Sequence, residues 1–276
     1  MKYALEYALL RIALGIFAVL PTRGASATGG AIFRTVGPFM GISRIARKNM
    51  RASFPGWDEA RIERVVRDMW DNLGRIVAEY PHLEDIARHR TTFLNPGAFP
   101  KQGPVVFVGG HVGNWEVLPP AMLHQLKIAM HPAYRAPNNP YVDALIVKYR
   151  SHGGHLRSFG KTRKGLAGIM QALQGGESVG LLIDQKLNTG IEAQFFGRPA
   201  MTSTAFVELA KKIGCPLVPI RVVRLPGCRF VAQAAEPLNV GDRPTEDIVA
   251  DMHRVLESWI TEHPEQWLWL HRRWKN

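Results

Sequence analysis

The stretch PVVFVGGHVGNWE, from Pro104 to Glu116, carries the strongest fold signal in this chain of 276 residues. Its first half, Val105 to Val108, is a short apolar run rich in β-branched residues, and Gly109 and Gly110 follow it. Such a run between proline and glycine is typical of a buried strand. Polar residues come directly after the glycines, so the stretch predicts a strand that ends in a turn and leads into a helix.

His111 and Glu116 are the candidate chemical groups of this stretch. On one continuous helix they would lie roughly 140° apart around the axis, so a helix alone would not bring them together. A turn after the strand would let His111 reach back toward the first helical residues. A histidine beside a carboxylate can act as a general base, because the carboxylate fixes the tautomer and stabilises the imidazolium. The alternative is a histidine that only caps a helix, and the pair alone leaves both open.

Composition and charge limit the classes of protein. A chain with 46% hydrophobic residues can bury one sizeable core or two small domains. The net charge of +12 favours acidic partners, such as nucleic acid, an anionic membrane, or an acidic protein or phosphorylated substrate. The two cysteines, Cys215 and Cys228, lack CxxC spacing and form no disulfide framework, which fits a reducing compartment.

The N-terminal segment is predicted to associate with a membrane. Tyr3 to Leu20 is apolar apart from Glu6 and Arg11, and as a helix it would be about 27 Å long, just short of a ~30 Å hydrocarbon core. The small residues from Gly24 to Gly30 predict a linker. Four basic residues then recur at helical spacing and would attract anionic lipid, by ~1 kcal/mol each near the surface; these are Arg44, Arg47, Lys48 and Arg51. A buried soluble helix is the alternative for the first segment.

From Pro104 onward, strands alternate with helices, which predicts an α/β fold with a single largely parallel or mixed sheet flanked by helices. The predicted strands are Val105–Val108, Ile128–Tyr134, His155–Phe159, Val179–Ile183, Leu217–Val223 and Phe230–Ala235. The predicted helices are Asp58–Tyr80, Asn139–Ser151, Thr162–Leu173, Thr202–Ile213 and Pro244–Glu262. We therefore divide the chain into a membrane-associating N-terminal segment, residues 1–45, and an α/β domain, residues 46–276.

His111, Arg135 and Asp184 follow three of the predicted strands at their C-terminal ends. Open α/β sheets bind ligands at that edge, near a switch in strand order. The guanidinium of Arg135 suits a phosphate or carboxylate group, although it could instead pair with Asp143. The carboxylate of Asp184 could accept hydrogen bonds from substrate hydroxyls, orient an arginine, or only cap a loop.

Two other segments are predicted to have mainly structural roles. In FFGRPAMTST, from Phe195 to Thr204, a Gly-Arg-Pro turn precedes hydroxyls at a helix start, where backbone N–H groups could receive an anion or form a simple cap. Tryptophans crowd the C-terminal end, and core packing is favoured over an interfacial belt for them; they are Trp259, Trp267, Trp269 and Trp274. The sequence contains no GxSxG elbow for covalent acyl catalysis and no HExxH zinc motif.

Several stretches together resemble one family. HVGNWE, at 111–116, matches the His-x4-acid signature of the glycerolipid and lysophospholipid acyltransferase superfamily, and its glutamate resembles the branch of late lipid A acyltransferases, the lauroyl and myristoyl transferases of Gram-negative bacteria. The resemblance covers roughly Gly103 to Trp274. It continues through YRAPNNPYVD, KGLAGIMQAL, the IDQ at 183–185, FFGRPAMTSTAFVELA, CPLVPI and HPEQWLWLHRRW.

The resemblance implies a glycerolipid acyltransferase-like fold and an enzyme that moves a fatty acyl chain from acyl–acyl carrier protein to a hydroxyl of a 3-hydroxyacyl chain on a lipid A precursor. It implies His111 as the general base and Glu116 as its orienting partner, with no metal or other cofactor. The residues expected to bind substrate are Asn114, Arg135, Asn139, Asp184 and Arg198.

The same resemblance implies acyl carrier protein, a lipid A precursor and an anionic membrane surface as partners. The expected location is the cytoplasmic face of the bacterial inner membrane. A lysophospholipid or another glycolipid is the alternative acceptor. A non-enzymatic nucleic-acid-binding protein is suggested by charge alone, and no recognised binding motif supports it, so nucleic acid is not expected as a partner.

Overall fold

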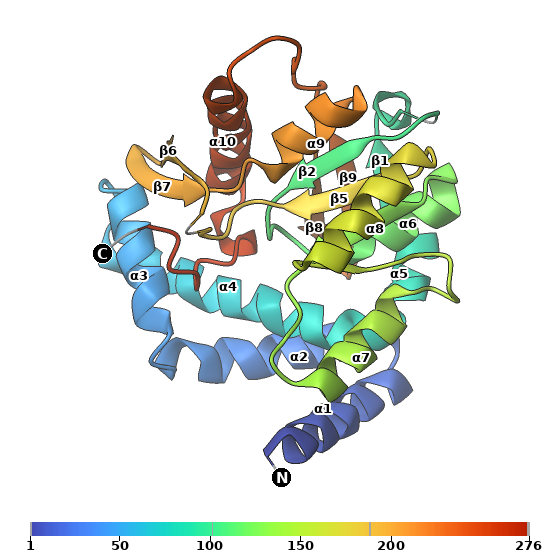
Figure 1. Cartoon of the computed structure of the whole chain (residues 1–276). Helices are drawn as coiled ribbons and strands as arrows, with labels where there is room; N and C mark the ends of the chain where they lie inside the picture. Colours follow the sequence, from blue (N-terminus) through green and yellow to red (C-terminus); the bar gives the residue numbers. More distant parts are fainter. Residues whose placement is uncertain (1, 101, 188, 275–276) are drawn as a thin grey trace.

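A seven-stranded, largely parallel sheet lies at the centre of the computed structural model, which describes residues 2–100, 102–187 and 189–274 (Figure 1). The strand order is β1-β9-β8-β2-β5-β3-β4, and only β8 and β9 pair antiparallel within this sheet. The strands are β1 (Thr91–Leu94), β2 (Val106–Gly109), β3 (Met130–Tyr134), β4 (Phe159–Gly160), β5 (Ser178–Leu182), β8 (Leu217–Leu225) and β9 (Arg229–Ala234). The predicted α/β fold with one largely parallel sheet is confirmed.

The predicted strand β2 lies in the middle of the sheet, between β8 and β5. Val106 and Val108 face one hydrophobic core, whereas Val105 and Phe107 face the other, and all four are fully buried. Successive side chains of a strand point to opposite faces. A central parallel strand is therefore apolar on both sides, which explains the continuous apolar run in the sequence.

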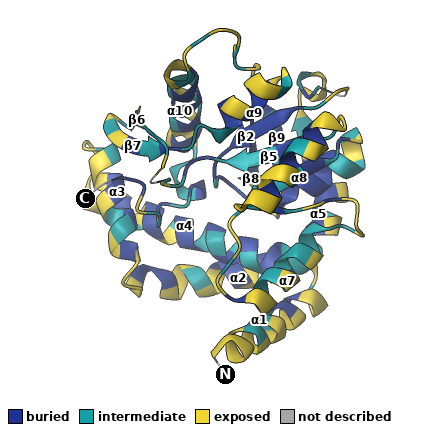
Figure 2. Cartoon of the chain, in the orientation of Figure 1, coloured by how far each residue is buried: buried dark blue, intermediate teal, exposed yellow. Residues whose placement is uncertain are grey.

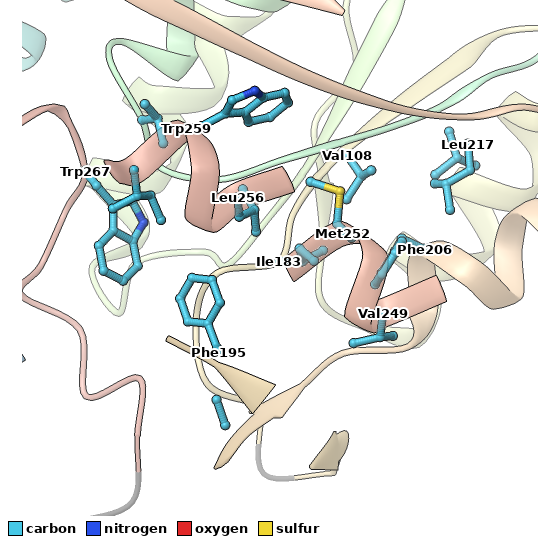
Figure 3. Close-up of a cluster of buried hydrophobic side chains, with 14 of the residues drawn as sticks. Val108, Ile183, Phe195, Phe206, Leu217, Val249, Met252, Leu256, Trp259 and Trp267 are labelled. Atoms are coloured by element: carbon cyan, nitrogen blue, oxygen red, sulfur yellow. The ribbon is translucent and has the colours of Figure 1, made fainter. Parts of the chain in front are cut away.

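Helices cover both faces of the sheet, and their outward sides carry most of the exposed residues (Figure 2). The first core packs the sheet against α4, α8, α9 and α10, and the second packs it against α5 and α6. Figure 3 shows part of the first core, where Val108 and Leu217 of the sheet lie among Phe206 of α9 and Val249 and Met252 of α10. These helices are α4 (Glu59–Glu79), α5 (Leu83–His89), α6 (Leu118–Ala121), α8 (Arg163–Gln174), α9 (Ala205–Ile213) and α10 (Thr245–Glu262).

A separate two-stranded hairpin was not predicted. The strands β6 (Ile191–Phe195) and β7 (Arg198–Thr202) pair antiparallel across Phe196 and Gly197. Both turn residues have positive φ, +51° and +65°, as a tight two-residue hairpin turn requires. The Gly-Arg-Pro segment therefore closes a hairpin before α9 begins at Ala205, rather than leading straight into a helix.

The N-terminal region is more helical than the sequence predicted. Helix α1 spans Lys2–Val19, and α2 spans Thr22–Val36, so the predicted linker from Gly24 to Gly30 lies inside a helix. Its small residues serve close packing: a Cβ on Gly29 would come within 2.5 Å of Ala78 Cβ on α4. The division at residues 45 and 46 stays a prediction. Among the described residues, no helix is long and apolar enough to cross a membrane.

The predicted basic stripe lies on α3, which spans Ser43–Ser53. Arg47 donates to Glu63 Oε2 at 2.9 Å, and Arg51 donates to Glu59 Oε2 at 2.7 Å. Two of the four predicted cations are therefore paired with carboxylates of α4. Arg44, Lys48 and Arg51 remain exposed, and attraction of this stripe to anionic lipid stays a prediction.

Candidate active site

A cavity of about 160 Å³ lies at the C-terminal ends of β2, β3 and β5. Its walls include apolar side chains of the sheet, such as Phe107, Met130 and Leu182. Its polar lining is supplied by His111, Glu116, Tyr134, Arg135, Arg150, Lys161 and Gln185. The cavity is at the sheet edge where the sequence predicted a ligand site.

His111 pairs with Asp184 in this cavity. Nδ1 of His111 lies 2.7 Å from Oδ1 of Asp184, and the backbone N–H of His111 donates to Oδ2 of the same carboxylate, also at 2.7 Å. Strand register explains the pairing: Gly109 of β2 faces Leu182 of β5, so the two residues each lie two positions beyond a matched pair. A carboxylate acceptor keeps the proton on Nδ1 and leaves the Nε2 lone pair of the ring available.

Asp184 is fully buried and stays ionised. Burial alone would raise the pKa of its carboxyl group, but the charge of His111 and the hydrogen bonds from His111 outweigh burial and hold the pKa well below its usual value. The indole N–H of Trp267 also donates to Oδ2, at 2.7 Å. The carboxylate is therefore fixed from several sides and is suited to stabilise an imidazolium.

Glu116 does not pair with His111, and this corrects the expected His111–Glu116 dyad. Arg150 engages both oxygens of Glu116, with Nε to Oε2 at 2.7 Å and Nη2 to Oε1 at 2.5 Å. The indole of Trp115 donates to Oε1 at 2.9 Å. The reason is local: Gly113, with φ of +63°, turns the chain before a 3₁₀ turn at Trp115–Val117, which directs Glu116 to α7 (Pro140–Arg150).

The Glu116–Arg150 pair is nearly buried, with side-chain exposures of 5% and 16%. Burial opposes both charges, yet the attraction between them dominates, so the pKa of Glu116 is lowered and the pKa of Arg150 is raised. Both residues line the cavity. Nη1 of Arg150 is buried without a hydrogen-bond partner among the described residues, so it is a donor available to a substrate group.

Further cations stand at the same cavity. Arg135 is exposed and lines it, and Asp143, its predicted alternative partner, instead accepts a hydrogen bond from the Tyr134 hydroxyl at 2.9 Å. Lys161 also lines the cavity, where burial, followed by the charge of Arg135, lowers its pKa. With Arg150, these side chains give the cavity a positive character suited to anionic groups.

The whole chain, residues 1–276, matches the sequence model of one family, described as bacterial lipid A biosynthesis acyltransferase. The chain belongs to this family. An Escherichia coli K12 lipid A biosynthesis lauroyltransferase is 33% identical over 153 residues, which are 51% of this chain and 47% of that protein. This alignment thus spans about half of the lauroyltransferase.

A second relative aligns with most of the chain. A lipid A biosynthesis palmitoleoyltransferase of the same strain is 28% identical over 247 residues, covering 84% of this chain and 78% of the relative. Among solved structures, the 1-acyl-sn-glycerophosphate acyltransferase PlsC of Thermotoga maritima superposes with a TM-score of 0.42 and 12% identity, over 95% of this chain and 99% of that one.

Three of the residues that the lipid A acyltransferase resemblance predicts to bind substrate do not line the cavity among the described residues. Each of them has a structural partner instead. Asn139 caps α7 and donates to the backbone oxygen of Tyr3 at 2.8 Å. Asn114 is fully buried and donates to Glu79 Oε2 at 2.7 Å. Arg198 lies over the ring of Trp274, with its guanidinium carbon 4.4 Å from the centroid. The cavity lining that the structure describes therefore does not include these three residues, and their contact with substrate stays a prediction.

Two residues of the family-like segments that carry no predicted role, Gln185 and His271, lie beside His111, and Gln185 also lines the cavity. Nε2 of Gln185 lies 3.3 Å from His111 Nε2 and 3.2 Å from His271 Nε2. Burial lowers the pKa of His271 to about 4, so this ring is neutral at neutral pH. The C-terminal segment reaches the site because Leu268 N donates to the backbone oxygen of His111 at 3.2 Å. In the sequence, the HPEQWLWLHRRW ending was the signal that could have identified His271. Its position beside His111 depends on the fold and could not be read from the sequence.

The four C-terminal tryptophans are core residues, as the sequence favoured. Trp267 and Trp269 are almost completely buried and contact each other edge to face, with ring centroids 4.5 Å apart. Trp267 also supports Asp184 through its indole N–H. The aromatic cluster thus connects the hydrophobic core to the candidate dyad.

Proposed function

We propose that this chain transfers a fatty acyl group from acyl–acyl carrier protein to a hydroxyl of a 3-hydroxyacyl chain on a lipid A precursor. Family membership supports lipid A acyl transfer in general. The observation that carries the proposed mechanism is the buried Asp184 that holds Nδ1 of His111 at the cavity. A neutral imidazole oriented in this way is a general base for a hydroxyl.

In the proposed reaction, His111 Nε2 takes the proton of the acceptor hydroxyl as the oxygen attacks the thioester carbonyl. The imidazolium that forms is stabilised by Asp184. The tetrahedral intermediate then expels the phosphopantetheine thiolate, which takes the proton from the imidazolium. The new bond is an oxygen ester, the broken bond is the thioester C–S bond, and no acyl-enzyme is formed.

The cations at the cavity support an anionic acceptor or donor. Arg135 is exposed at the opening, and Arg150 carries an unpartnered Nη1 among the described residues. A guanidinium binds phosphate oxygens with directed, charge-assisted hydrogen bonds. Lipid A precursors carry phosphates and the donor carries phosphopantetheine, so both fit a basic cavity. The overall charge of +12 also suits the acidic carrier protein.

We also propose that the protein sits on the cytoplasmic face of the inner membrane, with α1 lying in the interface. Figure 2 shows α1 exposed along most of its length at the lower edge of the molecule. Its exposed apolar residues recur at three- and four-residue steps, which is one helix face; they are Leu5, Leu9, Ile12, Ile16 and Val19. An exposed apolar face along a helix is typical of an interfacial helix.

The function is tested with purified protein, a panel of acyl–acyl carrier proteins, and three acceptors. These are a bisphosphorylated lipid A precursor, the same lipid without its 3-hydroxyl groups, and a lysophospholipid. We expect the mass of the first acceptor alone to rise by one acyl group. Acylation of the lysophospholipid instead would favour the alternative acceptor, and acylation of the lipid without 3-hydroxyls would exclude the proposed position.

A further inference from the structure

Two histidines and a glutamate from three separate segments converge outside the catalytic cavity. Glu84 lies in the first turn of α5, His124 lies in the π-helical turn Met122–Leu126, and His152 follows α7. We propose that these three side chains form a binding site for a zinc ion. The site would be structural, and the acyl transfer described above does not require it.

The ligand atoms are already close to the arrangement that zinc requires. Oε2 of Glu84 lies 2.9 Å from Nε2 of His124 and 3.3 Å from Nδ1 of His152, and all three atoms lie within 4.8 Å of one another. Zinc binds imidazole nitrogen and carboxylate oxygen at about 2.0 to 2.2 Å, so its tetrahedral ligands are roughly 3.3 to 3.5 Å apart. Small side-chain shifts would therefore place one ion among the three atoms.

The surroundings leave these atoms free to act as ligands. The side chains of His124 and His152 are only 14% and 6% exposed, while Glu84 is half exposed and leaves room for a water molecule as a fourth ligand. Nε of Arg88 donates to the other oxygen, Oε1, at 2.5 Å, so Oε2 remains directed at the imidazoles. Outer hydrogen bonds of this kind orient the ligands of zinc sites.

A metal ion and a proton compete for the same nitrogen lone pairs of these imidazoles. Without metal, the same atoms form two hydrogen bonds to a carboxylate. Direct metal measurement therefore distinguishes an ion from a proton at this cluster.

A bound ion would connect three segments near the catalytic cavity. His152 lies two residues after Arg150, which ends α7 and clamps Glu116 at the cavity wall. Zinc would fix this end of α7 against α5 and against the turn that carries His124. The expected consequence is a more stable protein when zinc is bound, since a ligand that binds only the folded state raises its stability.

The site is tested on the full chain after removal of any polyhistidine tag and treatment with a chelator. Zinc is returned, the protein is dialysed, and bound metal is measured by mass spectrometry together with the melting temperature. The variant is His124→Asn/His152→Asn. The matched control is His155→Asn, which changes an exposed histidine of the same turn. We expect about one zinc per chain and a raised melting temperature in wild type and control.

The double variant should bind zinc more than about 100-fold more weakly, because two of three ligands are removed. Glu84→Gln, which keeps both imidazoles, provides a second variant if the double variant folds poorly, and it should also lose the zinc-dependent rise in melting temperature. Cobalt should give the intense visible spectrum of a tetrahedral site in wild type and in the His155→Asn control, and in neither ligand variant. The proposal is overturned if the wild-type protein retains no zinc after dialysis. It is also overturned if the variants bind zinc as tightly as wild type. None of these readouts depends on acyl transfer.

Discussion

The indole N–H of Trp267 donates a hydrogen bond of 2.7 Å to Oδ2 of Asp184, the oxygen that also accepts from the backbone N–H of His111. Trp267 belongs to the C-terminal segment, and the three groups are far apart in sequence. A buried tryptophan thus fixes the carboxylate that orients the candidate base. The conformation of the last residues is expected to control turnover as well as stability.

Trp267→Phe should lower kcat by about 10-fold, because it removes a charge-assisted hydrogen bond of about 1.5–3 kcal/mol from Asp184 and keeps an aromatic ring in the core. The matched control is Trp269→Phe. Trp269 is equally buried, but its indole donates to the backbone oxygen of Pro264. Both variants should melt at lower temperature, and only the first should lose turnover. An equal loss of kcat in both would assign Trp267 to packing alone.

Glu116 is expected to act through Arg150 rather than through His111. Glu116→Gln should lower the free energy of unfolding by about 3–5 kcal/mol, because it leaves the buried guanidinium of Arg150 without a charged partner. Arg150→Met should be similarly destabilising. The double variant should be more stable than the sum of the two single effects predicts, which urea unfolding measures. Additive effects, within about 0.5 kcal/mol, would show that the pair is not coupled.

Strand signals were readable from the sequence, but the partner of His111 was not. The run Val105–Val108 is buried on both faces, so its composition alone identified a buried strand. Asp184 stands 73 residues from His111, and only the pairing of β2 with β5 brings them together. Glu116, five residues away, was the nearer and more obvious carboxylate. Sequence proximity therefore favoured the wrong partner.

Several other features of the structure were not predicted from the sequence, each for a physical reason. Gly24 to Gly30 has a linker-like composition, yet those residues let α2 approach α4 closely, as the contact of Gly29 with Ala78 requires. The edge strand β1 has four residues and pairs only with β9 among the described strands, so it lacks a long apolar run. Arg150 and Lys161 gave no local signal, because their importance depends on which helix ends meet at the cavity.

Acid should destabilise the protein through His271. Its folded pKa of about 4 is below the ordinary value of about 6.5, so the unfolded chain binds the proton first as the pH falls. His271 therefore leaves the free energy of unfolding unchanged above about pH 6.5 and lowers it progressively as the pH falls from there to about 4. Between pH 7.5 and 4.5, wild type should lose up to about 2 kcal/mol more than His271→Gln in urea unfolding. Equal losses in both proteins would contradict this assignment.

The apolar face of α1 should determine binding to lipid. Leu9→Glu/Ile12→Glu places two charges on that face and should weaken cosedimentation with anionic vesicles by about 10-fold or more. The matched control is Leu94→Glu/Leu166→Glu, at positions with comparable exposure on β1 and α8. The control should bind vesicles like wild type. If both double variants lose binding equally, net charge rather than α1 mediates the association.

The central claim is that His111, held by Asp184, removes the proton of the acceptor hydroxyl. The most direct measurement is the rate at which His111→Ala acylates the lipid A precursor under saturating donor and acceptor, with the melting temperature as a check of folding. General base catalysis typically contributes about 10²–10⁴-fold, so we expect a loss of this size with little change in melting temperature. A folded His111→Ala protein that retains turnover within a few fold of wild type would contradict the account.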